Sequence, residues 1–465
     1  MFPNPQAALP LPPRPNLEQY KKLAKDLVKA CKSSDQDAIG SWAEKWIERL
    51  ARLPGAKITP KLRRRMDREI DQVEEFARSK LSPEAQLANK TRTERSAKTK
   101  VSTCALTNAQ FVIALSHGFE SWPKLAKHIE GLARPNSPVS EFESAADAIV
   151  TGDVATLKRL LREDPELIRA RSTREHRATL LHYVSANGVE GYRQKTPKNA
   201  LKVAEILLDA GAEVDAEADV YGGGATTLGL VATSVHPFRV GVQNPLIQIL
   251  LDHGAQIDYP DGAGNGQGAV MGCLANGRGE AAVYLAERGA RLNLEAAAGV
   301  GRLDVVKTFF SPDGSLKANC TKAQMESAFQ YACREGHISV VDFFLQKGVD
   351  VRTHSGDGQT ALHWAAIGGK LEMIKFLLKR KNAPLEVTNM YGGTVLGQTL
   401  WSAAHGGDAD VYIPIIETLI AAGARIPDRH PPINRRVDEL LERHGSHAHE
   451  SWWWYGEKPR ERRVK

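Results

Sequence analysis

The sequence predicts an all-α fold: a solenoid of about eight helix-turn-helix units with short β-hairpin fingers, preceded by a small helical domain. Three observations support this prediction. The chain has 465 residues, which exceeds one ordinary core. Endings such as "LLDAGAEVD" (207–215) and "LLDHGAQID" (250–258) return roughly every 34 to 43 residues within 141–426, as in a solenoid. A Pro/Ser/Asn stretch at 133–140 separates this array from residues 1–135, where Lys and Arg outnumber Asp and Glu by ten.

The basic front, residues 1–135, predicts several helices. Residues 16–53 predict two, because their apolar side chains fall at helical spacing. Within the charged stretch 56–105, residues 61–80 predict an exposed helix with charges of both signs, and residues 89–100 predict a flexible basic linker.

Residues 106–132 predict two more helices, for which two interpretations stay open. They resemble a helix-turn-helix, and the basic surroundings of residues 56–132 would then favour nucleic-acid binding. The second helix, however, offers only Lys124, Lys127 and His128, with no Arg, Asn or Gln to contact base edges. A helical hairpin that caps the first unit of the solenoid explains the same residues, and we prefer it.

Composition and cysteine usage predict the cellular location of the protein. Five cysteines without CxxC spacing fit buried reduced thiols better than a disulfide framework. Residues 1–20 do not predict a signal peptide, because prolines interrupt them. No apolar run in the sequence is long enough to span a membrane. We therefore expect a cytoplasmic protein.

The most regular unit is "GQTALHWAAIGGKLEMIKFLL", residues 358–378. Thr360 is placed to cap a first helix, and Gly368 and Gly369 are placed to end it. Leucine and isoleucine at 371, 374, 377 and 378 form the apolar stripe of a second helix. Neither helix buries its face alone, so stacking on neighbouring units must supply the partner surface.

This unit resembles the ankyrin repeat, whose hallmark is a TPLHxAA first helix and a VVxxLLxxGA second helix; Ala361 stands where the family has proline. The resemblance, to a bacterial-type multi-repeat ankyrin protein with an N-terminal helical extension, covers residues 141–426. It implies that His182 and His363 hold hydrogen bonds between loops. It also implies a protein-recognition scaffold, although a fold does not fix a function.

Candidate binding residues lie where units depart from the pattern. Inserts at 189–199 and 235–244 belong to consecutive units and are expected to touch, and a third lies at 407–413. The first two offer cationic and aromatic groups suited to an anionic or planar partner: Tyr192, Arg193, Lys195, His236, Phe238 and Arg239. Solvated charges on drifting loops are the simpler interpretation.

Two further pairs of aromatic residues are candidates. Tyr221 and Tyr391 begin the near-duplicate stretches "YGGGATTLG" and "YGGTVLG", where glycines either form tight turns or let backbone amides approach a ligand. Trp364 and Trp401 lie on predicted first helices, which line the concave face of ankyrin solenoids, so they are candidate partner anchors or buried packing residues.

Recognition of a protein partner through the concave face and inserts is the favoured function. Two alternatives stay open: a small-molecule or enzymatic site in the two inserts, and nucleic-acid binding by residues 56–132. The sequence shows no catalytic motif, and we predict no cofactor and no metal, because His444, His447 and His449 lack supporting ligands. Residues 427–465 predict a capping helix at 433–443 and a Trp-rich tail.

Overall fold

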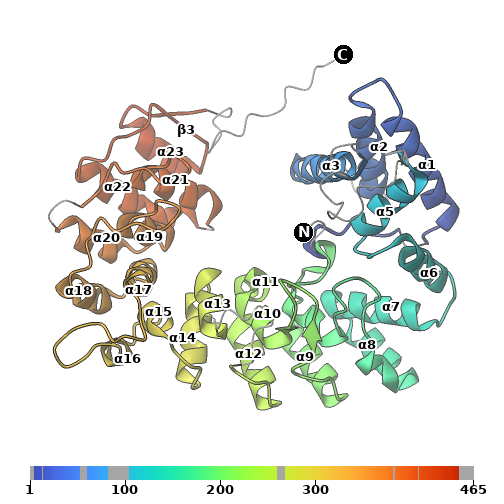
Figure 1. Ribbon diagram of the computed structural model, residues 1–465, viewed down its shortest axis with the longest axis horizontal. Helices are drawn as coiled ribbons and strands as arrows, with labels where there is room; N and C mark the ends of the chain where they lie inside the picture. The colour runs from blue at the N-terminus through green and yellow to red at the C-terminus, as the bar shows by residue number, and fades with distance from the viewer. Residues whose placement is uncertain are drawn as a thin grey trace, which may run out of the picture. The chain divides into compact units, whose positions relative to one another are not determined.

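A computed structural model describes residues 5–12, 14–52, 60–81, 104–258, 268–380, 383–406 and 408–449. The chain divides into two compact units, Met1–Gln267 and Gly268–Lys465 (Figure 1). Both are mostly helical, as predicted. The predicted basic linker at 89–100 and the Trp-rich tail lie outside the described residues.

The first unit begins with a bundle built from α1 (Leu17–Cys31), α2 (Ala38–Arg52), α3 (Pro60–Leu81), α5 (Leu106–Ser116) and α6 (Trp122–Leu132). The helices predicted within 16–53 and 106–132 are therefore confirmed. The prediction that the helix at 61–80 is exposed was wrong. One face of α3 is buried against α2 and α5. The alternating charges concealed an apolar stripe at i, i+4 and i+7 spacing, which consists of Met66, Ile70, Val73 and Ala77.

A disulfide joins Cys31, at the end of α1, to Cys104, just before α5. The expectation that all five cysteines are reduced was therefore wrong. Sequence spacing could not predict this pair, because packing of α1 against α5 brings together two residues that are 73 positions apart. Cys273, Cys320 and Cys333 are free thiols.

The rest of the first unit consists of helical hairpins. The paired elements are α7 (Pro138–Thr151) with α8 (Val154–Glu163), η3 (Leu180–Ser185) with α9 (Ala200–Asp209), and α10 (Thr227–Thr233) with α12 (Gln243–Asp252). The short helices η2 (Pro165–Arg169), η4 (Gly191–Arg193) and α11 (Val235–Val240) lie in the connections. Helix α6 packs against α7. The predicted hairpin at 106–132 therefore adjoins the first of these hairpins (Figure 1).

The second unit continues the same pattern. Its hairpins are α13 (Ala269–Ala275) with α14 (Gly279–Glu287), α15 (Leu294–Gly299) with α16 (Leu303–Thr308), α17 (Lys322–Glu335) with α18 (Ile338–Gln346), α19 (Ala361–Ile367) with α20 (Leu371–Leu378), and α21 (Val395–His405) with α22 (Ile413–Ala421). First helices stack on one another, α15 on α17, α17 on α19 and α19 on α21. One apolar cluster runs through these hairpins from Leu294 to Leu441, which supplies the partner surface that a single unit lacks.

Strands are short. In the first unit β1 (Glu217–Ala218) pairs antiparallel with β2 (Ala225–Thr226), which forms the expected hairpin finger. In the second unit β3 (Arg429–His430) pairs parallel with β4 (His447–Ala448). Between these two strands, α23 (Arg435–Glu442) occupies the region of the predicted capping helix. Within the described chain, every helix is too short or too polar to cross a bilayer.

The two histidines of the repeat motif have the predicted architectural role. His363 Nδ1 accepts from the Thr360 amide at 3.2 Å, while its Nε2 lies 3.1 Å from the carbonyl oxygen of Gly393 in the next finger. His182 repeats both contacts, with the amide of Thr179 and the carbonyl of Ala225. Burial lowers the pKa of both rings, to about 4 for His182. Both are therefore neutral at pH 7, and each joins one finger to the next.

Candidate functional site

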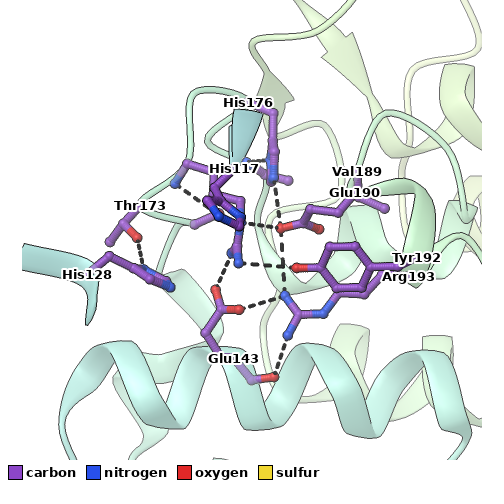
Figure 2. A network of polar contacts seen from close by, with 12 residues as sticks. His117, His128, Glu143, Thr173, His176, Val189, Glu190, Tyr192 and Arg193 are labelled. Atoms are coloured by element: carbon purple, nitrogen blue, oxygen red, sulfur yellow. Dashed lines mark hydrogen bonds and ion pairs between the residues drawn. The ribbon is translucent and has the colours of Figure 1, made fainter. Parts of the chain in front are cut away.

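The first insert, 189–199, turns inward. Residues Gly191–Arg193 form the short helix η4, which directs the Arg193 side chain to Glu143 on α7 and the Tyr192 hydroxyl to Arg174 (Figure 2). The Arg193 side chain is only 5% exposed, whereas Lys195 is exposed. Of the three residues predicted here, two are therefore held in a buried cluster and one faces solvent.

Two arginines clasp one carboxylate at the centre of this cluster. Glu143, on α7, accepts from Arg174 Nη1 at 2.5 Å and from Arg193 Nη1 at 2.7 Å, one on each carboxylate oxygen. Arg193 Nε also donates to Asp147 at 2.8 Å, one turn further along α7. Arg174 Nη2 donates to the hydroxyl of Tyr192 at 3.2 Å. The insert is therefore fixed to α7 by charge-assisted hydrogen bonds.

Glu190 is the second carboxylate, and it is fully buried. Its Oε1 lies 3.0 Å from Arg174 Nε, 3.4 Å from His176 Nε2 and 3.6 Å from Arg193 Nη1. The hydroxyl of Tyr183 donates to the same oxygen at 3.4 Å. Two carboxylates and two guanidinium groups thus alternate in a buried site.

The electrostatics favour the charged forms throughout. Burial alone would raise the pKa of Glu143 and Glu190, but Arg174 and Arg193 outweigh it, and the pKa of each carboxyl lies below its usual range. Burial has the opposite effect on the neighbouring imidazoles, because it disfavours their charged form. It lowers the pKa of His117 to about 4 and that of His128 to about 3. At neutral pH the cluster therefore holds fixed ion pairs with neutral histidines beside them.

The cluster also reaches the N-terminal bundle. His128, on α6, contacts the Thr173 hydroxyl through Nδ1 at 2.7 Å (Figure 2). The Arg174 guanidinium lies 5.4 Å from the centre of the Phe119 ring, in the α5–α6 turn. These contacts tie the bundle to the loop before η3. The burial of His128 leaves Lys124 and Lys127 of the three polar groups that this helix offered to the nucleic-acid interpretation.

Sequence reasoning missed Glu143, Arg174, His176 and Glu190. A signal existed for Glu143, because it lies within the buried face of α7, next to Phe142 and three residues before Ala146. No such signal marks Arg174 or His176, which occupy an irregular loop. Because the charged groups of the cluster are paired with one another, Arg193 cannot clamp a substrate anion without breaking its ion pairs.

The second insert, 235–244, packs beside α10. The buried amide of Gln243 donates to the carbonyls of Val231, Ala232 and Ser234, at 2.9 to 3.1 Å, and so closes the loop. His236 is half-buried, and burial lowers its pKa. Phe238 and Arg239 are exposed on α11. The expected contact between the two inserts stays a prediction.

The candidate aromatic residues of the fingers and of the first helices differ in their exposure to solvent. Tyr221 is 55% exposed and its hydroxyl donates to Asn187 Oδ1 at 2.7 Å; Tyr391 is 49% exposed. Trp364 is half-buried on α19, beside the Arg334 guanidinium, and packs against the apolar cluster. Trp401 is half-buried on α21, and its ring stacks on His405 with 4.7 Å between centroids. Both tryptophans lie on first helices, as predicted.

The third insert is also engaged within the chain. Asp410, in η5 (Ala409–Tyr412), accepts from Arg436 Nη1 at 2.5 Å and from Asn434 Nδ2 at 3.1 Å. Among the residues that the structure describes, His, Cys, Asp and Glu do not gather in groups of three or more that suit a metal ion.

Comparison with known proteins agrees with this architecture. A family model described as ankyrin repeats (3 copies) matches residues 294–389. The human Notch-regulated ankyrin repeat-containing protein is 32% identical over 107 residues, which are 21% of this chain and 86% of that protein. A putative ankyrin repeat protein of Acanthamoeba polyphaga mimivirus is 36% identical over 83 residues, 18% of this chain and 20% of that protein. The class defined by the stacked hairpins and their histidine contacts is thus that of a repeat solenoid. This chain belongs to the ankyrin-repeat family.

Proposed function

We propose that the protein is a recognition scaffold that binds a protein partner through its repeats. Ankyrin repeats typically mediate protein–protein interactions, and the matched region 294–389 supports that assignment for the second unit. We extend the repeats to 141–426, with residues 1–135 as a basic helical domain and 427–465 as a cap and tail. The full count of eight units and the bacterial-type relationship belong to this proposal.

The observation that carries the proposal is the apolar finger between α20 and α21. Val387, Met390 and Tyr391 are 44%, 68% and 49% exposed and lie within five residues of one another. The finger is braced rather than loose. The Asn389 side chain accepts from the amides of Tyr391 and Gly393, and the Met390 amide donates to the Asp357 carbonyl at 2.8 Å. Rigid, exposed apolar groups are typical of partner-binding anchors.

The alternatives have less support. Nucleic-acid binding requires cations available to phosphate, yet on α3 the guanidinium groups of Arg63, Arg65 and Arg78 form ion pairs with carboxylates. A small-molecule site in the inserts would need Tyr192 and Arg193, which are engaged in the buried cluster. The cytoplasmic location stays a prediction, and the Cys31–Cys104 disulfide weakens one observation behind it.

The test compares partners retained by the full chain and by finger variants. We expect Met390→Asp with Tyr391→Ala to weaken binding of a retained partner at least tenfold in a titration. Lys375→Ala, an exposed position on neighbouring α20, is the matched control and should leave that affinity unchanged. A partner that binds equally to both variants would contradict the finger assignment. Steep loss of binding with salt, together with retention of duplex DNA, would instead support the nucleic-acid alternative.

A further inference from the structure

A cleft of about 670 Å³ lies between α1 and α2 of the N-terminal bundle. Ligand pockets in proteins have volumes of roughly 300 to 1,000 Å³, so the cleft is large enough for a small molecule. Leu23 and Ala30 of α1, with Trp42 and Trp46 of α2, supply most of its apolar lining. The described residues that line it fall within 19–49, so one helical hairpin forms the site.

The two tryptophans form a fixed floor for this cleft. Trp42 and Trp46 are 7% and 3% exposed, and their ring centroids lie 5.1 Å apart. The Trp42 indole Nε1 donates to the carbonyl oxygen of Leu23 at 3.2 Å, which ties α2 to α1. The aromatic floor is therefore held in place before a ligand arrives, so binding orders few additional side chains.

Helix α2 divides its charges between two faces. Glu44 and Glu48 face α3, where both carboxylates contact the Arg63 guanidinium, at 3.4 and 3.2 Å. Lys45 and Arg49 instead line the cleft, one helical turn apart, and both are exposed. Neither of them has an ion-pair partner within the described part of the chain. Like charges at i and i+4 disfavour a helix, and an anion bound between them would remove that repulsion.

The acidic residues of the cleft are already engaged. Asp26 of α1 forms an ion pair with Lys22 at 3.5 Å. Asp35, in the turn between the two helices, accepts from the Asp37 amide at 3.0 Å. The charges on the α2 wall are therefore the ones left for a ligand, and they are positive.

We propose that this cleft binds a small aromatic carboxylate. The carboxylate would lie between Lys45 and Arg49, because a guanidinium group can donate two parallel hydrogen bonds to it and the ammonium group adds a second charge. The ring would cover Leu23 and the accessible edges of the two indoles. This site goes beyond the proposed function, since it uses neither the repeat hairpins nor the finger at 387–391.

The test titrates the full chain with 2-naphthoate in a calorimeter, beside two probes that each lack one feature. 2-Naphthalenemethanol has the ring without the charge, and acetate has the charge without the ring. We expect 2-naphthoate to bind at least tenfold more tightly than either probe. Its affinity should fall as salt is added, because exposed charges are screened, and it should raise the Tm of the unaltered chain.

Three variants locate the binding site. Arg49→Gln should weaken 2-naphthoate binding at least tenfold. Arg52→Gln is the matched control, because it removes the same charge from the same helix at a residue that pairs with Glu48 at 3.6 Å and lies outside the cleft lining. This control should leave the affinity unchanged. Ser41→Phe adds a ring to the cleft from an exposed position, so it should abolish binding while the circular dichroism spectrum stays the same.

Three results would overturn the proposal: no binding of 2-naphthoate, equal binding of 2-naphthoate and the alcohol, or equal losses in Arg49→Gln and Arg52→Gln. A hexaglutamate peptide that displaces 2-naphthoate at a tenfold lower concentration would identify an acidic protein segment as the occupant and would also overturn it. The finger variant Met390→Asp should leave 2-naphthoate binding unchanged. Failure of the cleft and failure of the finger assignment are therefore distinguishable.

Discussion

The hairpins η3/α9, in the first unit, and α19/α20, in the second, share one local device and differ in what surrounds it. Both hold a Thr-x-x-His capping pair whose imidazole reaches the next finger. Around α19 the neighbours are apolar helices of one continuous cluster. Around η3 they include two buried arginines and two buried glutamates. Identical repeat chemistry can therefore be stabilised by dispersion and burial in one place and by paired charges in another.

The two hairpins should therefore differ in how strongly a substitution in their surroundings changes the stability of the protein. Apolar packing tolerates small changes in proportion to the volume removed, whereas a buried ion pair that loses one partner leaves an uncompensated charge.

Two buried glutamates, one in each unit, give the sharpest comparison. We expect Glu190→Gln to lower the free energy of unfolding by about 3–5 kcal/mol, because Arg174 and Arg193 lose a buried counter-charge. Glu295, on α15, is 9% exposed, and burial raises the pKa of its carboxyl. Glu295→Gln should therefore be neutral or slightly stabilising. Denaturant unfolding measures both, and equal losses would contradict the contrast.

Reduction of the disulfide should also act on the first unit alone. Cys31 and Cys104 are 73 residues apart, and opening a loop of that length is expected to cost about 4 kcal/mol through the entropy of the unfolded chain. Cys31→Ser should reproduce the effect of a reductant. Protection against hydrogen exchange should fall in α1 and α5 and stay unchanged in α17 and α19. A loss of protection in α17 would contradict this prediction.

Acid should destabilise the first unit before the second. Burial lowers the pKa of His117, His128 and His182 from 6.5 to about 4, 3 and 4, so the unfolded chain binds more protons than the folded chain. Their contribution, on the order of 3 kcal/mol each, is complete above pH 6.5 and is lost as pH falls toward 4.

In the second unit, Glu295 and Glu335 shift in the opposite direction, because burial raises the pKa of both carboxyls. Their protonation favours the folded state, which partly offsets the histidines there. Hydrogen exchange resolved along the chain, at pH 7 and pH 5, should show greater loss of protection in 104–258 than in 268–449. The reverse order would overturn the assignment.

The smallest effect concerns the device that both regions share. His182→Ala and His363→Ala should each cost about 1–3 kcal/mol, since each leaves a buried amide and a finger carbonyl without a partner. The two losses should agree within the error of a denaturant titration. A large inequality would show that the surroundings, and not the capping pair, determine the contribution.

Much of the fold followed from the sequence alone. The 3.6-residue periodicity and the recurring helix endings located the helices, because these features depend on residues close together in the chain. The resemblance to the ankyrin repeat implied the hydrogen bonds that His182 and His363 make between loops. The same local reasoning placed Trp364 and Trp401 on first helices.

Only the tertiary structure decided what the irregular parts do. It turned Arg193 inward to Glu143 on α7 and Tyr192 inward to Arg174. It also buried one face of α3 and joined Cys31 to Cys104, and it placed Leu9 against the end of α5. A charged residue is predicted from the sequence to be exposed to solvent, whether or not the fold places an opposite charge beside it. Pairing across the fold, unlike helical spacing, leaves no periodic trace in the chain.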